Sequence, residues 1–126
     1  MTRTELESFA RAFFAKVDAQ KADDLRPLLT EDVRLQMANL APSTGADDLI
    51  AAFRATEERF LSIRHDIQGI WTGADNQDLV VSVEAIANYE IFDGRRVALP
   101  VNSTLRLRDG KVADYRIFMD PGPAFA

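Results

Sequence analysis

The last acidic side chain of this sequence, Asp120, stands where proton-transfer chemistry could occur. It follows the apolar run Ile117-Phe118-Met119 and precedes a Pro-Gly-Pro segment, so it lies at the end of a strand that enters the core. Burial at such a position raises the pKa of a carboxyl group toward the range of general acids and bases. The alternative is that Asp120 caps the strand end or pairs with an arginine such as Arg116.

His65 and Glu84 are the other candidates for catalysis. His65 is the only histidine, and imidazole is the side chain whose charge changes most readily near neutral pH. It either assists Asp120 or is a core histidine bonded to the backbone. Glu84 interrupts an apolar stretch, and it lies in a cavity, at a subunit interface or on a solvated edge.

The elements that must position these residues are strands in the second half of the chain. Alternating apolar residues predict strands over 63–71 and 79–92, and two long strands over 95–120. The dipeptide Asp109-Gly110 joins the last two, because both residues suit the φ > 0 conformation of a tight hairpin turn. Gly69 is expected to weaken the first of these strands or to introduce a bulge.

The first half of the chain is predicted to be mainly helical. Apolar spacing predicts a helix over 5–19, with Thr4 and Glu7 forming a capping box, and a shorter helix over 23–29. A strand over 32–37 follows, and a third helix begins near Ala46. Segregated helices and an antiparallel run of strands predict an α+β fold with helices packed on one face of a curved sheet.

The composition limits the classes of function. The 126 residues, 47% of them hydrophobic, suffice for one domain spanning 1–126. A net charge of −5 argues against a nucleic-acid partner. The absence of cysteine and the single histidine argue against a zinc site, and we expect neither a metal nor a cofactor. No signal peptide or membrane span is recognisable, so the expected location is the cytoplasm.

The strand over 79–92 carries apolar residues on both of its faces. Val81, Val83 and Ala85 alternate with residues such as Val80 and Ile86. One face covers the helices, and the opposite face needs a cover of its own. The simplest cover is a second copy of the chain, so we expect a homodimer that forms through the outer face of the sheet.

The order of elements and several segments resemble the NTF2-like superfamily. The segments are Asp93-Gly94 followed by Val97–Pro100, and Arg106–Val112 leading into Tyr115–Asp120. Over essentially the whole chain the sequence is most similar to the SnoaL-like polyketide cyclase branch, which is related to limonene epoxide hydrolases and ketosteroid isomerases. The resemblance implies three N-terminal helices packed in the concave face of a strongly curved, mainly antiparallel sheet.

The resemblance also implies an apolar cavity between the sheet and the helices. In the cyclases the acid that matches Asp120 is the general acid or base. The epoxide hydrolases use an arginine and an aspartate at positions that match Glu84 and Ile86 here, so epoxide hydrolysis is disfavoured. The cavity would be lined by residues that equally suit ordinary core packing: Tyr89, Asn102, Phe118, Trp71, Phe53 and Met37.

Two classes of function remain open at this point. The first is a cofactor-free cyclase, isomerase or lyase that acts on a small, apolar, oxygen-bearing molecule, with Asp120 as acid or base and His65 or Glu84 assisting. The second is a domain of the same fold without catalysis, either a ligand carrier or a dimeric interaction module. An open cavity around a raised-pKa carboxyl group would favour the enzyme, and a filled cavity would favour the interaction module.

Overall fold

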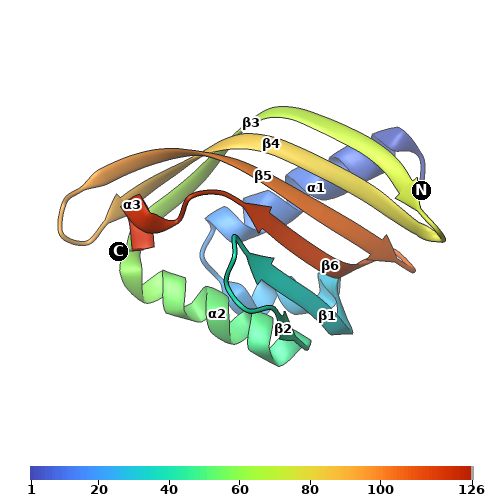
Figure 1. Ribbon diagram of the computed structural model, residues 1–126, viewed down its shortest axis with the longest axis horizontal. Coiled ribbons are helices and arrows are strands. Elements are labelled where there is room, and N and C mark those ends of the chain that lie inside the picture. The colour runs from blue at the N-terminus through green and yellow to red at the C-terminus, as the bar shows by residue number, and fades with distance from the viewer. Residues whose placement is uncertain (126) are drawn as a thin grey trace.

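The computed structural model describes residues 1–125 and consists of one curved sheet with helices on its concave side (Figure 1). The elements in chain order are α1 (Arg3–Asp18), η1 (Ala22–Leu28), β1 (Leu29–Met37), β2 (Ser43–Thr44), α2 (Ala46–Arg59), β3 (Phe60–Asp75), β4 (Asp78–Ile91), β5 (Arg96–Arg108), β6 (Lys111–Phe118) and α3 (Gly122–Phe125). This arrangement confirms the predicted α+β fold class.

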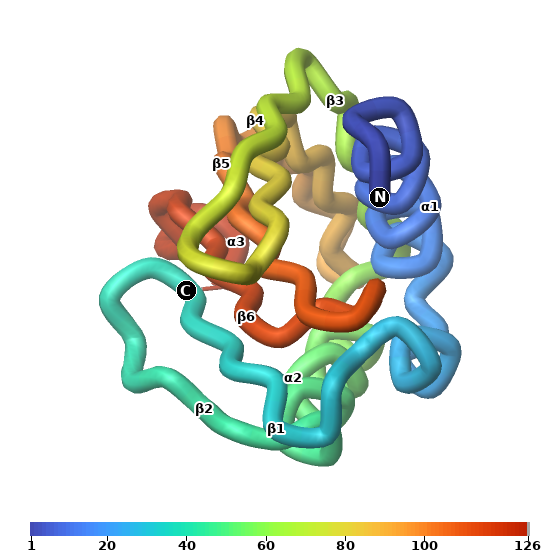
Figure 2. Tube along the Cα trace, turned by 90° about the vertical axis from the view of Figure 1, so that its right-hand side faces the viewer, coloured from blue at the N-terminus to red at the C-terminus, as the bar shows by residue number. Residues whose placement is uncertain are grey.

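The six strands lie in the order β2-β1-β6-β5-β4-β3. All neighbours are antiparallel except β1 and β6, which run parallel. The hairpin between β5 and β6 turns through Asp109 and Gly110, whose φ angles of 54° and 76° are the left-handed values predicted for this turn. Figure 2 shows the sheet bending from β3 to β1 with α1 on the side toward which it bends.

The core lies between the concave face of the sheet and the helices. Phe13 of α1, Leu49 of α2 and Leu105 of β5 are all completely buried in it. On the long strands the inward residues alternate with outward ones, as period-two patterning requires. The sheet therefore has an inner face that covers the helices and an outer face that no other described element covers.

The first helix begins two residues earlier than the sequence pattern predicted. Thr2 is its N-cap and accepts a hydrogen bond from the Glu5 backbone N–H, while the Glu5 carboxylate accepts one from the Thr2 backbone N–H. The capping box therefore uses Thr2 and Glu5 in place of Thr4 and Glu7. Both pairs have the same spacing, so the pattern alone did not separate them.

A bulge in β3 determines which of its side chains face the concave side of the sheet. The pairing with β4 shifts between Ile67 and Gly69, so one extra residue lies on β3 at this point. Before the bulge His65 faces inward, and after it Ile70 faces inward while Trp71 faces outward. The Trp71 ring lies over Gly69, where a Cβ would come within 2.6 Å of it. Any other residue at Gly69 would displace the indole.

The remaining elements match the predictions apart from their ends. The second predicted helix is the 3₁₀ helix η1, with Pro27 inside it. Strands β1 and β3 extend beyond their predicted limits, and the two short elements β2 and α3 have no predicted counterpart. No helix among residues 1–125 is long and apolar enough to cross a membrane.

Candidate functional site

A small chamber lies between the inner face of the sheet and the helices. Its volume is about 40 Å³. Most of its wall is apolar, and five residues contribute polar side-chain groups: Thr56 of α2, His65 of β3, Tyr89 of β4, Ser103 of β5 and Tyr115 of β6. We call this space the inner chamber.

His65 is held in the chamber wall by Asp18, the last residue of α1. The His65 Nδ1 lies 2.6 Å from Asp18 Oδ1, and the His65 backbone N–H donates to Asp18 Oδ2 at 2.8 Å. The two side chains are 8% and 20% exposed. An ionised carboxylate can only accept hydrogen bonds, so in the neutral imidazole the proton lies on Nδ1 and Nε2 has the lone pair. The described residues provide no partner for Nε2.

The two tyrosines of the chamber are neutral hydrogen-bond donors. Burial, and secondarily the negative charge of Asp18, raise the pKa of Tyr89 to about 12. The pKa of Tyr115 is also raised, first by burial, and a hydrogen bond with Ser103 opposes this shift. Within residues 1–125 the Tyr89 hydroxyl has no hydrogen-bond partner. The chamber thus combines a positioned imidazole with an unused hydroxyl donor.

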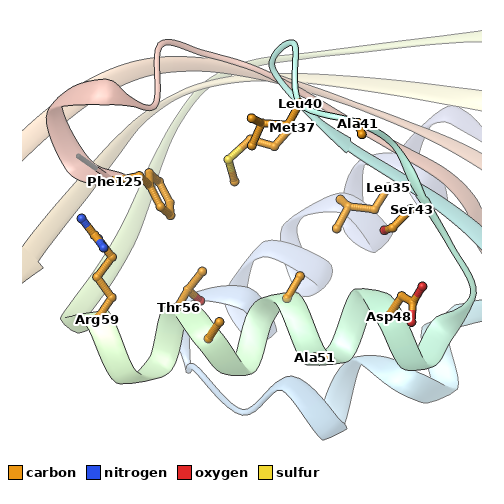
Figure 3. A pocket seen from close by; sticks show the side chains of 12 residues that line it. Leu35, Met37, Leu40, Ala41, Ser43, Asp48, Ala51, Thr56, Arg59 and Phe125 are labelled. Atoms are coloured by element: carbon orange, nitrogen blue, oxygen red, sulfur yellow. The ribbon is translucent and has the colours of Figure 1, made fainter.

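A larger groove opens beside the chamber, between α2 and the segment that joins β1 to β2 (Figure 3). Its volume is about 580 Å³ and its wall is mostly apolar. One side is a single face of α2, which is formed by residues at helical spacing: Asp48, Ala51, Ala52, Ala55, Thr56 and Arg59. We call this space the α2 groove.

Three side chains separate the α2 groove from the inner chamber. Met37, Thr56 and Phe125 contribute to the walls of both spaces. The ring centroid of Phe125 lies 5.2 Å from that of Phe60 and 6.0 Å from that of Tyr89. The guanidinium of Arg59 covers the Phe125 ring, with 5.7 Å from Cζ to the ring centroid. The two spaces are therefore adjoining compartments of one site.

Four of the nine residues predicted from the sequence line the inner chamber. They are His65, Tyr89, Phe53 and Met37, which come from β3, β4, α2 and β1. The structure brings them together because β3 and β4 pair directly, whereas β1 reaches the same space through its pairing with β6. Their roles toward a ligand remain predictions.

The prediction that Asp120 is buried in the cavity is wrong. Asp120 is exposed and lines neither compartment. Its Oδ1 accepts a hydrogen bond of 3.1 Å from the Gly122 backbone N–H, at the start of α3. The β6 strand ends at Phe118, two residues earlier, so the chain has left the inner face before it reaches Asp120. The alternative that Asp120 caps the strand end describes its position better.

Four further residues predicted for the site lie together on the outer face of the sheet. Glu84 pairs in register with Asn102, which pairs with Phe118, and Trp71 lies beside this row. Glu84 is exposed, Trp71 and Phe118 are 56% and 55% exposed, and Asn102 bonds to Ser82. Strand parity turns Glu84, Asn102 and Phe118 outward, and the bulge turns Trp71 outward. Their placement in the cavity is therefore wrong.

The sequence analysis missed Asp18, Ser103 and Tyr115 as polar groups of the site. Asp18 carried a signal, because a negative charge at a helix C-terminus opposes the helix dipole and needs a compensating partner. Ser103 carried another, since it occupies an inward position between Val101 and Leu105 and is 2% exposed. Buried polar residues in an otherwise apolar row are either hydrogen-bonded or functional.

The described part of the chain contains no cluster of three or more His, Asp or Glu side chains arranged to hold a metal ion.

The sequence places this fold in a family. The sequence model described as the SnoaL-like domain matches residues 10–115. The chain belongs to the SnoaL-like domain family. This family is part of the NTF2-like superfamily, in agreement with the resemblance seen in the sequence. No curated protein sequence matches the chain.

Solved structures of this superfamily share the fold of the SnoaL-like chain. An LEH-like epoxide hydrolase from M. tuberculosis aligns over 97% of this chain and 87% of its own, with 21% identity and a TM-score of 0.77. A protein of ketosteroid isomerase-like fold from Catenulispora acidiphila aligns over 87% and 83%, with 19% identity and a TM-score of 0.77. A protein from a Jannaschia species, designated a SnoaL-like polyketide cyclase, aligns over 95% and 88%, with 18% identity and a TM-score of 0.75. At these identities the likeness establishes the fold alone.

Proposed function

We propose that this SnoaL-like protein binds a small, apolar, oxygen-bearing molecule and catalyses a proton transfer at carbon without a cofactor. Such a step belongs to isomerase or cyclase chemistry. The observation that carries the proposal is the 2.6 Å contact between His65 Nδ1 and Asp18 Oδ1 in the chamber wall. A carboxylate that fixes the tautomer of a buried imidazole makes the free nitrogen a positioned base.

The proposed step uses only groups of the inner chamber. His65 Nε2 removes a proton from a carbon next to a carbonyl group. The C–H electron pair forms a double bond to the carbonyl carbon, and the π pair of the carbonyl group moves to its oxygen. Asp18 stabilises the imidazolium that forms, because its carboxylate contacts Nδ1. The Tyr89 hydroxyl donates to the oxyanion, which is the donor arrangement that lowers the barrier of such steps. Returning the proton to a different carbon, or closing a ring, completes the reaction.

His65 takes the role that the sequence analysis gave to Asp120. An exposed carboxylate is well hydrated and is a weak base, whereas the imidazole is largely shielded from water in an apolar wall. Epoxide hydrolysis, the activity named for the M. tuberculosis neighbour, is disfavoured. In the resemblance to the epoxide hydrolases an arginine and an aspartate match Glu84 and Ile86, and both of these lie on the outer face of β4.

Deuterium exchange into a simple ketone tests the proposal without knowledge of the natural substrate. The protein is incubated with 2-heptanone in D₂O, and loss of the protons next to the carbonyl group is followed by NMR. The wild-type protein is expected to accelerate exchange over buffer, and His65→Gln is expected to lose about 10²–10⁴-fold of that acceleration. Thermal unfolding of both proteins verifies that the variant is folded.

The possible results separate the enzyme from the carrier. Equal exchange by the wild type and His65→Gln would overturn the assignment of His65 as the base. Binding of the ketone by the wild-type protein with no exchange would overturn catalysis and favour the non-catalytic ligand-binding domain.

A further inference from the structure

The two compartments of the site differ sharply in size. The α2 groove has a volume of about 580 Å³, within the range of ligand pockets, whereas the inner chamber has about 40 Å³. A water-sized group needs roughly 10–15 Å³ of such space, so the chamber accepts about three atoms. A fused-ring ligand cannot enter it whole. Only a small terminal group can reach His65 and Tyr89.

The compartments also differ in polarity. The polar donors and the imidazole are gathered in the chamber, while the middle of the α2 groove is lined by aliphatic and aromatic carbon, including Leu35, Leu40 and Phe125. The molecule that fits both compartments is therefore apolar over most of its length and polar at one end.

The face of α2 gives the groove its length and width. Its lining residues run from Asp48 to Arg59, eleven residues apart, which corresponds to about 16 Å along a helix axis. Between these ends the helix presents the short side chains of Ala51, Ala52 and Ala55, and Figure 3 shows the open space above them. Because these alanines are exposed, core packing does not account for their small size.

We propose that the ligand is an elongated apolar chain with one small carbonyl group at its end. The chain lies along α2 in the groove, and the oxygen-bearing end passes between Met37, Thr56 and Phe125 into the inner chamber. There the oxygen accepts from Tyr89 and the neighbouring carbon faces His65. This substrate class rests on the proposed function, and its binding can be measured independently of any reaction.

The test measures the affinity of a series of methyl ketones, from 2-pentanone to 2-undecanone, by calorimetry. Each added methylene that enters the groove is expected to tighten binding by up to about fourfold, until the groove is filled. In Ala55→Phe the new ring occupies the groove, so the gain in affinity with increasing ketone chain length should be lost. Glu58→Phe is the matched control, because Glu58 is an exposed residue of the same helix outside the groove and should keep the full gain.

The possible results separate the proposed ligand class from the proposed catalytic function. Affinity that does not change with chain length in the wild type, or a gain that Ala55→Phe leaves intact, would overturn the elongated ligand. Loss of the gain in Glu58→Phe would also overturn it, because the effect would not come from the groove. Length-dependent binding without deuterium exchange would support the ligand class and contradict the catalytic function. Thermal unfolding shows that the phenylalanine variants are folded.

Discussion

At the scale of single residues, the contact between Asp18 and His65 is the centre of the site. Asp18 ends α1, where its negative charge opposes the helix dipole, at a cost of about 0.3–1 kcal/mol. Its two hydrogen bonds to His65 offset this cost. A residue that is unfavourable for its helix and is held by a side chain in a cavity wall is typical of a functional position.

Asp18→Asn tests whether the carboxylate works through its charge. The amide keeps similar size but no longer fixes the tautomer or stabilises the imidazolium, so ketone exchange should fall about 10²–10⁴-fold. Loss of a charged hydrogen bond, about 1.5–3 kcal/mol, exceeds the relief of the helix dipole, so the free energy of unfolding should fall by roughly 0.5–2.7 kcal/mol. Exchange at the wild-type rate, measured by NMR, would show that Asp18 has only a structural role.

The buried tyrosines predict a dependence of stability on alkaline pH. The pKa of Tyr89 is raised from 10.0 to about 12 in the folded protein. The folded protein thus holds this proton to a higher pH than the unfolded chain. Between pH 10 and about 12 the free energy of unfolding should therefore fall, by about 2–3 kcal/mol in total from Tyr89.

Absorbance titration of the phenolate band measures this effect directly, because the chain contains only two tyrosines. Neither should ionise below pH 11 while the protein is folded, and denaturant melts at several pH values give the accompanying change in stability. A tyrosine that titrates near pH 10 in the native protein would mean that the chamber is open to water.

At the scale of elements, short-range patterns predicted which segments form helices and strands, and the turn at Asp109-Gly110 followed from residue type. The alternation along β4 indicated two faces but not which one is inward, so Glu84 was expected in the cavity although it lies outward beside the buried Val83. Trp71 was misplaced because one extra residue at the β3 bulge reverses all facing beyond it. Gly69 indicated a bulge near this point, but not which later side chains it would turn outward.

The site itself was less accessible to sequence reasoning than the fold. His65 was recognised because of its residue type, but its partner Asp18 lies 47 positions earlier, on a helix. Contacts of this kind depend on how α1 packs against β3, which residue spacing does not encode. Asp120 was chosen for its apolar neighbours, yet the chain turns outward after Phe118 and places it in solvent.

The position of Asp120 leads to a prediction for α3. Asn can accept the same hydrogen bond from the Gly122 backbone N–H, so Asp120→Asn should keep α3 in place. Ketone exchange should remain within about twofold of the wild-type rate, since the general base lies elsewhere. A loss comparable to that of His65→Gln, in a variant with unchanged thermal unfolding, would restore Asp120 as the acid or base.

At the scale of the whole molecule, the sheet separates an inner face, which lines the inner chamber, from an outer face open to solvent. The outer face carries Trp71 and Phe118, two large aromatic side chains that are more than half exposed. Large aromatic side chains that are exposed on the open face of a sheet are typical of interaction surfaces. We expect this face to join a second copy of the chain, so that the two cavities open away from the interface.

Sedimentation tests the dimer. The wild-type protein should sediment as a particle of twice the 14.1 kDa chain mass, and Phe118→Lys should shift it toward the monomer because the interface would bury an unpaired charge. Lys111→Ala, an exposed change at the β5–β6 turn, serves as the control. A wild-type monomer at micromolar concentration would refute the expected dimer and leave the ligand site unaffected.

The account depends most on the state of one imidazole, and the chain's single histidine makes it directly observable. Nuclear magnetic resonance of ¹⁵N-histidine-labelled protein reports which ring nitrogen holds the proton. For the neutral form of the ring we predict the proton on Nδ1, with Nε2 unprotonated, and loss of this preference in Asp18→Asn. A ring protonated at Nε2, or a spectrum unchanged by Asp18→Asn, would contradict the pairing from which the proposed chemistry follows.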